Sequence, residues 1–211
     1  MNWMKKVAVA LVCLLPLGLQ AAKIDTLQVK SPSMNKSIEV VVVSPDVAAT
    51  KACPVIYLLH GYGGNACTWV GIKPDLPKIA DEKGIFFVCP DGKNTWYWDS
   101  PLNADVRYET FISNELVKYV DSHYKTVADR KGRAITGLSM GGHGAMWNGL
   151  RHSDVFSAAG STSGGVDIRP FPKNWEMSVQ IGEKAKYPEN WEKYTVINLV
   201  PTLRKDQIAL I

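Results

Sequence analysis

Short apolar runs alternate along this chain with stretches in which apolar residues recur at helical spacing. Segments 23–29 (KIDTLQV) and 37–43 (SIEVVVV) alternate or are rich in β-branched residues, and the turn-like sequence SPSMNK lies between them. This pattern predicts a pair of antiparallel strands.

Four later runs are almost continuously apolar, as expected of strands buried on both faces: PVIYLL, GIFFVC, GRAITGL and VFSAAG. Segments 69–83, 107–124 and 139–152 lie between or after these runs. They are predicted to be helical, the first mainly in its later part. Strands that alternate with helices in this way predict an α/β fold, with a mostly parallel central sheet and helices on both faces.

The alternation is interrupted at residues 164–195, where three prolines and two tryptophans occur with little periodicity. We expect a lid-like surface insertion here, within a single domain that spans residues 23–211. The last segment, NLVPTLRKDQIALI, predicts a short helix and a final strand.

Residues 1–22 have the layout of a secretory signal peptide. A basic start (MNWMKK) precedes an apolar core (VAVALVCLLPLGL) and a small-residue exit (QAA), so cleavage is expected near Ala21 or Ala22. The apolar core is short for a membrane span, and Pro16 interrupts it. We therefore expect a periplasmic or secreted protein with no stable membrane insertion after signal cleavage.

The charge distribution and the positions of cysteine and histidine argue against a nucleic-acid-binding or metal-binding protein. The net charge is +4, and Lys and Arg form no run longer than a pair, so no nucleic-acid partner is expected. The sequence has no CxxC pair and no HExxH motif, and its four histidines are scattered, which gives no support to a metal site. Cys53 and Cys89 flank apolar runs and are predicted to be buried free thiols.

The sequence GLSMGG at 137–142 carries the main candidate chemistry. The motif G-x-S-x-G is weak alone, but here it follows a predicted strand and opens a predicted helix. That context predicts a sharp turn that exposes a nucleophilic Ser139. Gly137 and Gly141 flank the serine because side chains at those positions would clash in such a turn.

A second Gly-rich turn, HGYGG at 60–64, ends an earlier strand. Acyl transfer through a serine creates an oxyanion that two backbone N–H groups should bind, one after the nucleophile and one from this earlier loop. Those donors are predicted to be Met140 and Tyr62. His60 is expected to support the loop from beneath rather than to act as a base.

Five motifs occur together in this order: LLHGYGG, PDGKNTWYWDSP, YETFISNELVKYVDSHY, GLSMGGHGA and RHSDVFSAAGSTSG. Over about residues 24–211 they resemble the serine esterase family of the α/β-hydrolase fold. S-formylglutathione hydrolase (esterase D) typifies this family, which also includes tributyrin, feruloyl and acetylxylan esterases and the mycolyltransferases. The resemblance implies an α/β-hydrolase fold with Ser139 as nucleophile and Tyr62 and Met140 as oxyanion donors. It also implies ester or thioester substrates with modest acyl groups, and no cofactor.

The other two members of a catalytic triad have no clear place in this sequence. In this fold the acid and then the histidine follow the serine. The histidines after Ser139 are His143 and His152, both on the helix that leads away from it. The resemblance places the acid after the strand QIALI, at which the chain ends, whereas Asp206 precedes that strand. We therefore expect a C-terminally truncated esterase that lacks the catalytic Asp and His, and the last strand and helix.

Trp96, Tyr97 and Trp98 follow a predicted strand at its carboxyl end, where open α/β sheets bind ligands. They are candidates to stack on a sugar or a feruloyl ring, although packing in the core is an equal alternative for two of them. The sequence thus predicts an exported serine carboxylic-ester hydrolase for short acyl or aryl esters, including acetyl or feruloyl groups on polysaccharides. An acyltransferase of the same family and a non-catalytic carbohydrate-binding remnant remain alternatives.

Overall fold

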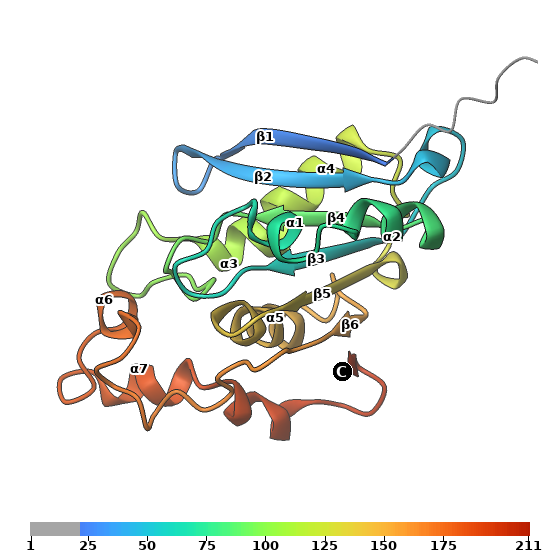
Figure 1. Ribbon diagram of the computed structural model, residues 1–211. Helices are drawn as coiled ribbons and strands as arrows, with labels where there is room; N and C mark the ends of the chain where they lie inside the picture. The colour runs from blue at the N-terminus through green and yellow to red at the C-terminus, as the bar shows by residue number, and fades with distance from the viewer. Residues whose placement is uncertain (1–21) are drawn as a thin grey trace, which may run out of the picture.

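A computed structural model describes residues 22–211 as one central sheet with helices on both faces (Figure 1). The predicted signal peptide lies outside the described residues except for Ala22. The seven strands have the order β1-β2-β4-β3-β5-β6-β7. They are β1 (Lys23–Ser31), β2 (Lys36–Ser44), β3 (Val55–Leu59), β4 (Phe86–Pro90), β5 (Arg133–Gly137), β6 (Ala158–Ala159) and β7 (Ala209–Leu210).

The sheet is antiparallel at one edge and parallel elsewhere. β1 pairs with β2 and β2 with β4 in antiparallel register. The strands from β4 to β7 are parallel to one another. The predicted antiparallel pair and the mostly parallel sheet are both confirmed. β6 and β7, at the other edge, contain only two residues each and are shorter than the sequence predicts.

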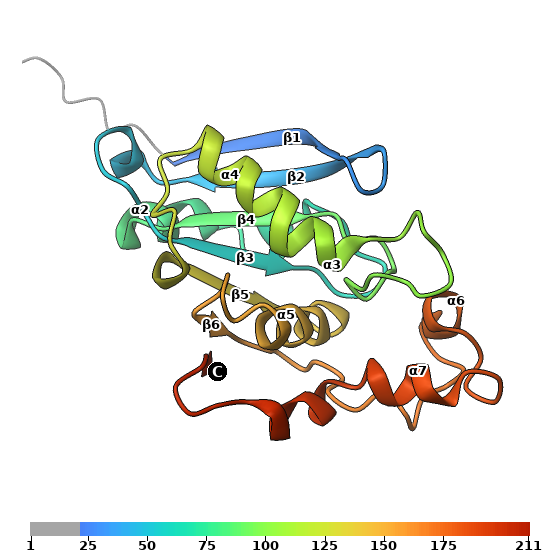
Figure 2. The same cartoon turned by 180° about the vertical axis from the view of Figure 1, so that it is seen from behind.

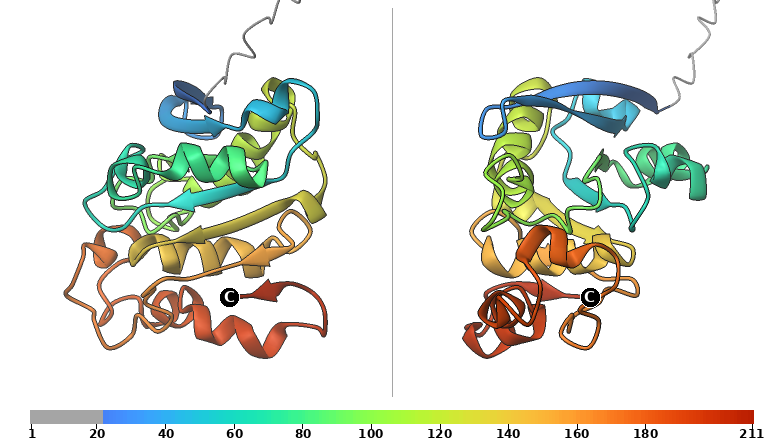
Figure 3. Two further views of the ribbon diagram at one scale, coloured as in Figure 1. Left: turned by 45° about the vertical axis from the view of Figure 1, so that its right-hand side comes forward. Right: turned by 90° about the vertical axis from the view of Figure 1, so that its left-hand side faces the viewer.

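Helices cover both faces of the sheet (Figure 2). One face carries α1 and α2, and the opposite face carries α3, α4 and α5, as the edge-on view in Figure 3 shows. The helices are α1 (Thr68–Ile72), α2 (Leu76–Lys83), α3 (Tyr108–Thr110), α4 (Val117–His123), α5 (Met140–Arg151), α6 (Met177–Ile181) and α7 (Pro188–Lys193). A π-helical stretch (Phe111–Leu116) joins α3 to α4, and 3-10 turns occupy Asp46–Ala49, Arg130–Gly132 and Val196–Thr202.

The valine run of β2 shows why the strands are apolar on both faces. Val40 and Val42 belong to the larger core beneath α4 and α5, whereas Val41 and Val43 belong to the smaller core beneath α1 and α2. Successive side chains of a strand point to opposite faces, so a strand covered on both sides must be apolar at every position.

Residues 164–195 pack more deeply than a surface cover. The segment contains α6 and α7, and Ile168, Met177 and Trp191 are buried within the larger core. The sequence did not indicate this burial because the anchoring side chains follow neither helical nor strand periodicity. Their spacing is set by turns between short helices.

Candidate functional site

Ser139 lies in the turn that joins β5 to α5, with φ 55° and ψ −116°. A residue with a side chain rarely adopts a positive φ, and doing so costs about 1–3 kcal/mol. The Ser139 N–H donates to the carbonyl of Thr162 over 2.8 Å, and the Leu138 N–H donates to that of Leu59 over 3.1 Å. The structure therefore contains the predicted strand–turn–helix, with the helix beginning at Met140 rather than at the serine.

Two glycines allow the strand and the helix to meet this closely. A Cβ atom at Gly137 would lie 2.3 Å from the backbone of Gly141. A Cβ atom at Gly141 would lie 2.2 Å from the carbonyl oxygen of Leu59 in β3. Both distances are far inside van der Waals contact with backbone atoms, which cannot rotate away. The predicted clash is therefore present at both positions.

The loop at residues 60–64 lies against the serine. A Cβ atom at Gly61 would be 3.5 Å from the Cβ of Ser139, and Tyr62, Ser139 and Met140 line the same pocket. Within residues 22–211, the backbone N–H groups of Tyr62 and Met140 donate no hydrogen bond. Met140 also begins α5, where the helix dipole favours negative charge. Two available amides beside a serine have the character of oxyanion donors.

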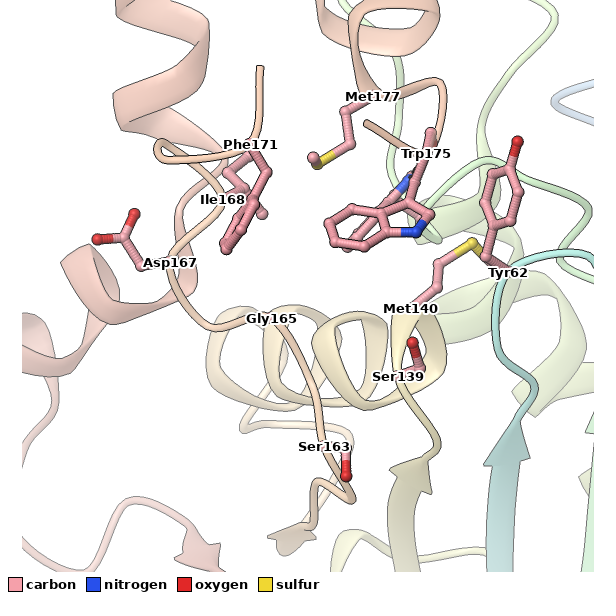
Figure 4. A pocket seen from close by; sticks show the side chains of 11 residues that line it. Tyr62, Ser139, Met140, Ser163, Gly165, Asp167, Ile168, Phe171, Trp175 and Met177 are labelled. Carbon is pink, nitrogen blue, oxygen red and sulfur yellow. Dashed lines mark hydrogen bonds between the residues drawn. The ribbon is translucent and has the colours of Figure 1, made fainter. Parts of the chain in front are cut away.

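The pocket above Ser139 is mainly apolar and has a volume of about 280 Å³ (Figure 4). Tyr62 and Met140 lie beside the serine, while Phe171, Trp175 and Met177 form the opposite wall. Its other lining residues are Trp96, Ser163, Gly165, Asp167 and Ile168. Most of this wall comes from residues 163–177, so the predicted lid-like segment supplies much of the pocket.

The three neighbouring aromatic candidates, Trp96, Tyr97 and Trp98, occupy different environments. Trp96 lines the pocket, whereas Tyr97 and Trp98 are fully buried and do not line it. The Tyr97 hydroxyl donates to the carbonyl of His60, and the Trp98 indole donates to His143. Trp96 and Tyr97 both have positive φ, 60° and 59°, and this turn separates the three side chains. Tyr97 and Trp98 are therefore withdrawn as substrate-binding candidates: they pack in the core, which is the alternative that the sequence left open for two of the three residues.

Trp175 is a pocket residue to which the sequence points only weakly. Its side chain is 45% exposed, and its ring centroid lies 5.5 Å from that of Phe171 and 6.4 Å from that of Trp96. The Trp96 indole N–H donates to the carbonyl of Trp175 over 3.1 Å. A tryptophan in a segment that contains three prolines was the available signal. Its contact with Trp96, 79 residues away, depends on the tertiary fold.

Glu176 connects the far wall of the pocket to the loop beside Ser139. The Asn94 amide accepts from the Gly63 N–H over 2.9 Å and donates to Glu176 over 3.2 Å. Partial burial, together with a hydrogen bond and the negative charge of Glu176, raises the pKa of Tyr62. Three chain segments are thus tied together around the opening of the pocket.

His60 lies beneath the Gly-rich loop rather than in the pocket. It is buried, its Nδ1 is 2.7 Å from the carbonyl of Gly61, and its Nε2 accepts from the Gly92 N–H over 2.9 Å. These contacts engage both ring nitrogens with the backbone of two loops. This geometry agrees with the supporting role expected for His60.

The other three histidines also have partners away from Ser139. His143 is fully buried and bonds Trp98 and the carbonyl of Gly165. His152 contacts the buried carboxylate of Glu109 at 2.8 Å, and His123 bonds the carbonyl of Tyr119 at the end of α4. Within residues 22–211, the Ser139 hydroxyl makes no hydrogen bond to a histidine or to any other group.

Two aspartates in the carboxyl-terminal part of the chain, Asp167 and Asp206, also lie away from Ser139. Asp167 lines the pocket but lies apart from Ser139 in Figure 4 and pairs with Arg169 through both carboxylate oxygens. Asp206 lies in the turn before β7, at the opposite end of that strand from the pocket side. The expected position of Asp206 is therefore confirmed.

Between residues 22 and 211, no group of three His, Cys, Asp or Glu side chains is arranged to hold a metal ion. The helices of this part of the chain are all too short or too polar to cross a membrane. Cys53 and Cys89 are buried free thiols, as predicted, and Cys67 is an exposed one.

Comparison with known proteins identifies the family of this chain and agrees with its fold. Residues 31–210 match the Esterase family, described as "Putative esterase". An esterase of Mycobacterium tuberculosis (strain CDC 1551 / Oshkosh) is 28% identical over 149 residues, which are 67% of this chain and 32% of that protein. An acetyl esterase of Caldicellulosiruptor saccharolyticus is 32% identical over 102 residues, which are 48% of this chain and 37% of that protein.

Solved structures give the same answer. A ferulic acid esterase is 28% identical with a TM-score of 0.69, and the match covers 89% of this chain and 74% of that chain. An S-formylglutathione hydrolase from Agrobacterium tumefaciens has a TM-score of 0.73 at 22% identity, over 86% of this chain and 72% of that chain, which shows likeness of fold alone.

The sheet order, the strained serine turn and these likenesses define an α/β-hydrolase. The chain belongs to the Esterase family, because the model of that family matches residues 31–210 of the chain. The family resemblance in the sequence is thereby confirmed. The chain spans only about a third of the length of the two curated relatives described above.

Proposed function

We propose that this protein is an exported serine carboxylic-ester hydrolase that cleaves short acyl or aryl esters through an acyl-serine intermediate. The observation that carries the proposal is the Ser139 hydroxyl, held at positive φ in a pocket beside the available amides of Tyr62 and Met140. The serine oxygen attacks the ester carbonyl carbon, and the two amides bind the resulting oxyanion. The alcohol then leaves, and water releases the acyl group from the serine.

Proton transfer is the part of this reaction that residues 22–211 do not supply. The serine must lose a proton as it attacks, and the leaving alcohol must gain one. All four histidines are engaged elsewhere, as described above. Loss of triad members lowers turnover by up to about a million-fold, leaving the contribution of the oxyanion donors. We expect the 211-residue polypeptide to be correspondingly slow.

An aromatic acyl group is the substrate feature that the pocket favours. Trp96, Phe171 and Trp175 line one cavity, and flat rings stack favourably in offset or edge-on geometry. One similar structure is named a ferulic acid esterase. We therefore favour aryl acyl esters such as feruloyl groups, with acetyl esters next, and polysaccharides as the natural alcohols.

Added imidazole tests this proposal directly, because it can replace a missing histidine base. Hydrolysis of p-nitrophenyl acetate by the 211-residue chain should rise at least about tenfold in imidazole, beyond the rate of imidazole alone. Ser139→Ala should abolish the increase, whereas Ser163→Ala, at the other serine of the pocket, should retain it. Equal rates with and without Ser139 would show that this serine is not the nucleophile.

Two alternative functions, an acyltransferase and a non-catalytic carbohydrate-binding protein, predict different experimental results. If an added acceptor alcohol receives the acyl group in place of water, the product is a new ester, and the protein is an acyltransferase. If feruloylated oligosaccharide binds equally well to the Ser139→Ala variant, and imidazole never produces turnover, the protein is a carbohydrate-binding remnant. We expect neither result.

A further inference from the structure

The backbone nitrogen of Ala22 makes a hydrogen bond that would be stronger if this nitrogen were a free N-terminus. The backbone nitrogen of Ala22 donates to one carboxylate oxygen of Asp81, on α2, over 2.8 Å. The other oxygen of Asp81 accepts from the backbone N–H of Asp46, also over 2.8 Å. One carboxylate thus joins the start of β1 to the turn that follows β2.

Ala22 is held by packing as well as by this hydrogen bond. Its side chain is partly buried against the smaller core, beneath α1 and α2. Lys23, the next residue, is exposed, and its ammonium pairs with Asp25 at 2.8 Å. Ala22 therefore contacts the body of the domain through both its backbone nitrogen and its side chain.

The two carboxylates at this position lack a compensating side chain. Within residues 22–211, neither Asp46 nor Asp81 forms an ion pair with Lys, Arg or His. Burial and the neighbouring Asp81 charge raise the pKa of Asp46. A positive group at the nitrogen of Ala22 would relieve this excess of negative charge.

We propose that the signal peptide is cut between Ala21 and Ala22, and that Asp81 binds the α-ammonium group that the cut creates. Hydrolysis of this peptide bond consumes one water. It leaves a carboxylate on Ala21 and an amine on Ala22, which takes up a proton. An α-amino group has a pKa near 8, so it is mainly charged at neutral pH. It would replace one neutral donor with three donors and a full charge, and charge-assisted hydrogen bonds are the stronger kind.

Cleavage one residue later would lose this contact. The new N-terminus would then be Lys23, and the nitrogen that Asp81 binds would leave with the signal peptide. The structure thus distinguishes between the two cleavage positions that the sequence leaves open. This inference rests on the export proposed above.

The first experiment is to express the full chain with its own leader in a bacterial host and to measure the intact mass of the periplasmic protein. We expect a mature chain that starts at Ala22. A periplasmic chain that starts at Lys23 or elsewhere would overturn the cleavage position while leaving export intact. A chain that stays in the cytoplasm with its leader would overturn both proposals.

The second experiment tests the ion pair. The chain starting at Ala22 is compared with the same chain extended by Gly-Ser, which turns the Ala22 nitrogen back into a neutral amide. The extension should lower the folding equilibrium constant about fivefold, measured by urea unfolding. The loss should vanish in Asp81→Asn and persist in Asp75→Asn, an exposed aspartate just before α2. An equal loss in all three backgrounds would show that Asp81 does not recognise the ammonium group.

Discussion

Trp98 donates a hydrogen bond from its indole N–H to Nε2 of His143 over 2.9 Å. The opposite nitrogen, Nδ1, lies 2.7 Å from the carbonyl of Gly165 and therefore carries the proton. This arrangement requires a neutral imidazole, because the protonated ring has no nitrogen that can accept. Burial lowers the pKa of His143 to about 4, despite the opposing effect of the Gly165 carbonyl.

His143 should make the free energy of unfolding depend on pH. Between pH 6.5 and 4 the unfolded chain binds a proton at this ring and the folded chain does not, so stability falls as pH falls through that range. The loss is about 3 kcal/mol in total. Urea unfolding at several pH values measures it. His143→Gln should flatten this part of the profile, and exposed His123→Gln should not. Parallel profiles for all three chains would contradict the assignment.

Gly141 should tolerate no side chain, because a Cβ atom there would lie 2.2 Å from the Leu59 carbonyl. We expect Gly141→Ala to destabilise the protein by about 3 kcal/mol or more, since the clash is with backbone. Gly71→Ala is the matched control, as nothing lies within 4 Å of the added atom. Urea unfolding of both variants tests this. Similar midpoints would mean that the turn relaxes easily.

The positive φ of Ser139 should lower the free energy of unfolding of the protein. Glycine adopts the observed φ of 55° without steric cost, whereas alanine keeps the strain of serine. Ser139→Gly is therefore expected to be about 1 kcal/mol more stable than Ser139→Ala, although both remove the hydroxyl. Thermal unfolding of the pair measures the difference. A more stable alanine variant would argue against a strained turn.

Substitution of Trp175 should affect ligand binding, whereas substitution of Trp98 should affect the stability of the fold. Trp175 is 45% exposed and lines the pocket, so Trp175→Ala should weaken binding of methyl ferulate about tenfold with little change in stability. Buried Trp98→Ala should instead cost about 3–5 kcal/mol of stability. Calorimetric titration and urea unfolding measure the two effects. The reverse pattern would remove Trp175 from the proposed binding surface.

The sequence was sufficient where periodicity and local turn chemistry determine structure. The β-branched run of β2 predicts a strand, the four continuously apolar runs predict strands covered on both faces, and the glycines around Ser139 predict the sharp turn. Each depends on interactions within a few residues or on the simple requirement to bury apolar surface. Tyr62 and Met140 could be selected because they occupy fixed positions relative to recognisable turns.

The residues that line the pocket could not be predicted from local patterns in the sequence. Trp96, Tyr97 and Trp98 are consecutive aromatic residues, and only two unusual backbone angles decide which one reaches the cavity. Trp175 meets Trp96 through a contact between distant segments. No local pattern encodes either contact, so the sequence predicts the position of the proposed nucleophile better than the surface that would select a substrate.

The glycine pair at the serine turn has a consequence for how this protein can diversify. Because neither Gly137 nor Gly141 can accept a single methyl group, mutation has almost no freedom in the turn that holds the proposed nucleophile. The opposite wall is built from a segment of turns and short helices, where exchanges such as Phe171 to a smaller residue leave the turn untouched. Under the proposed function, new acyl preferences can arise by gradual change in residues 163–177, while the turn that carries Ser139 stays unaltered.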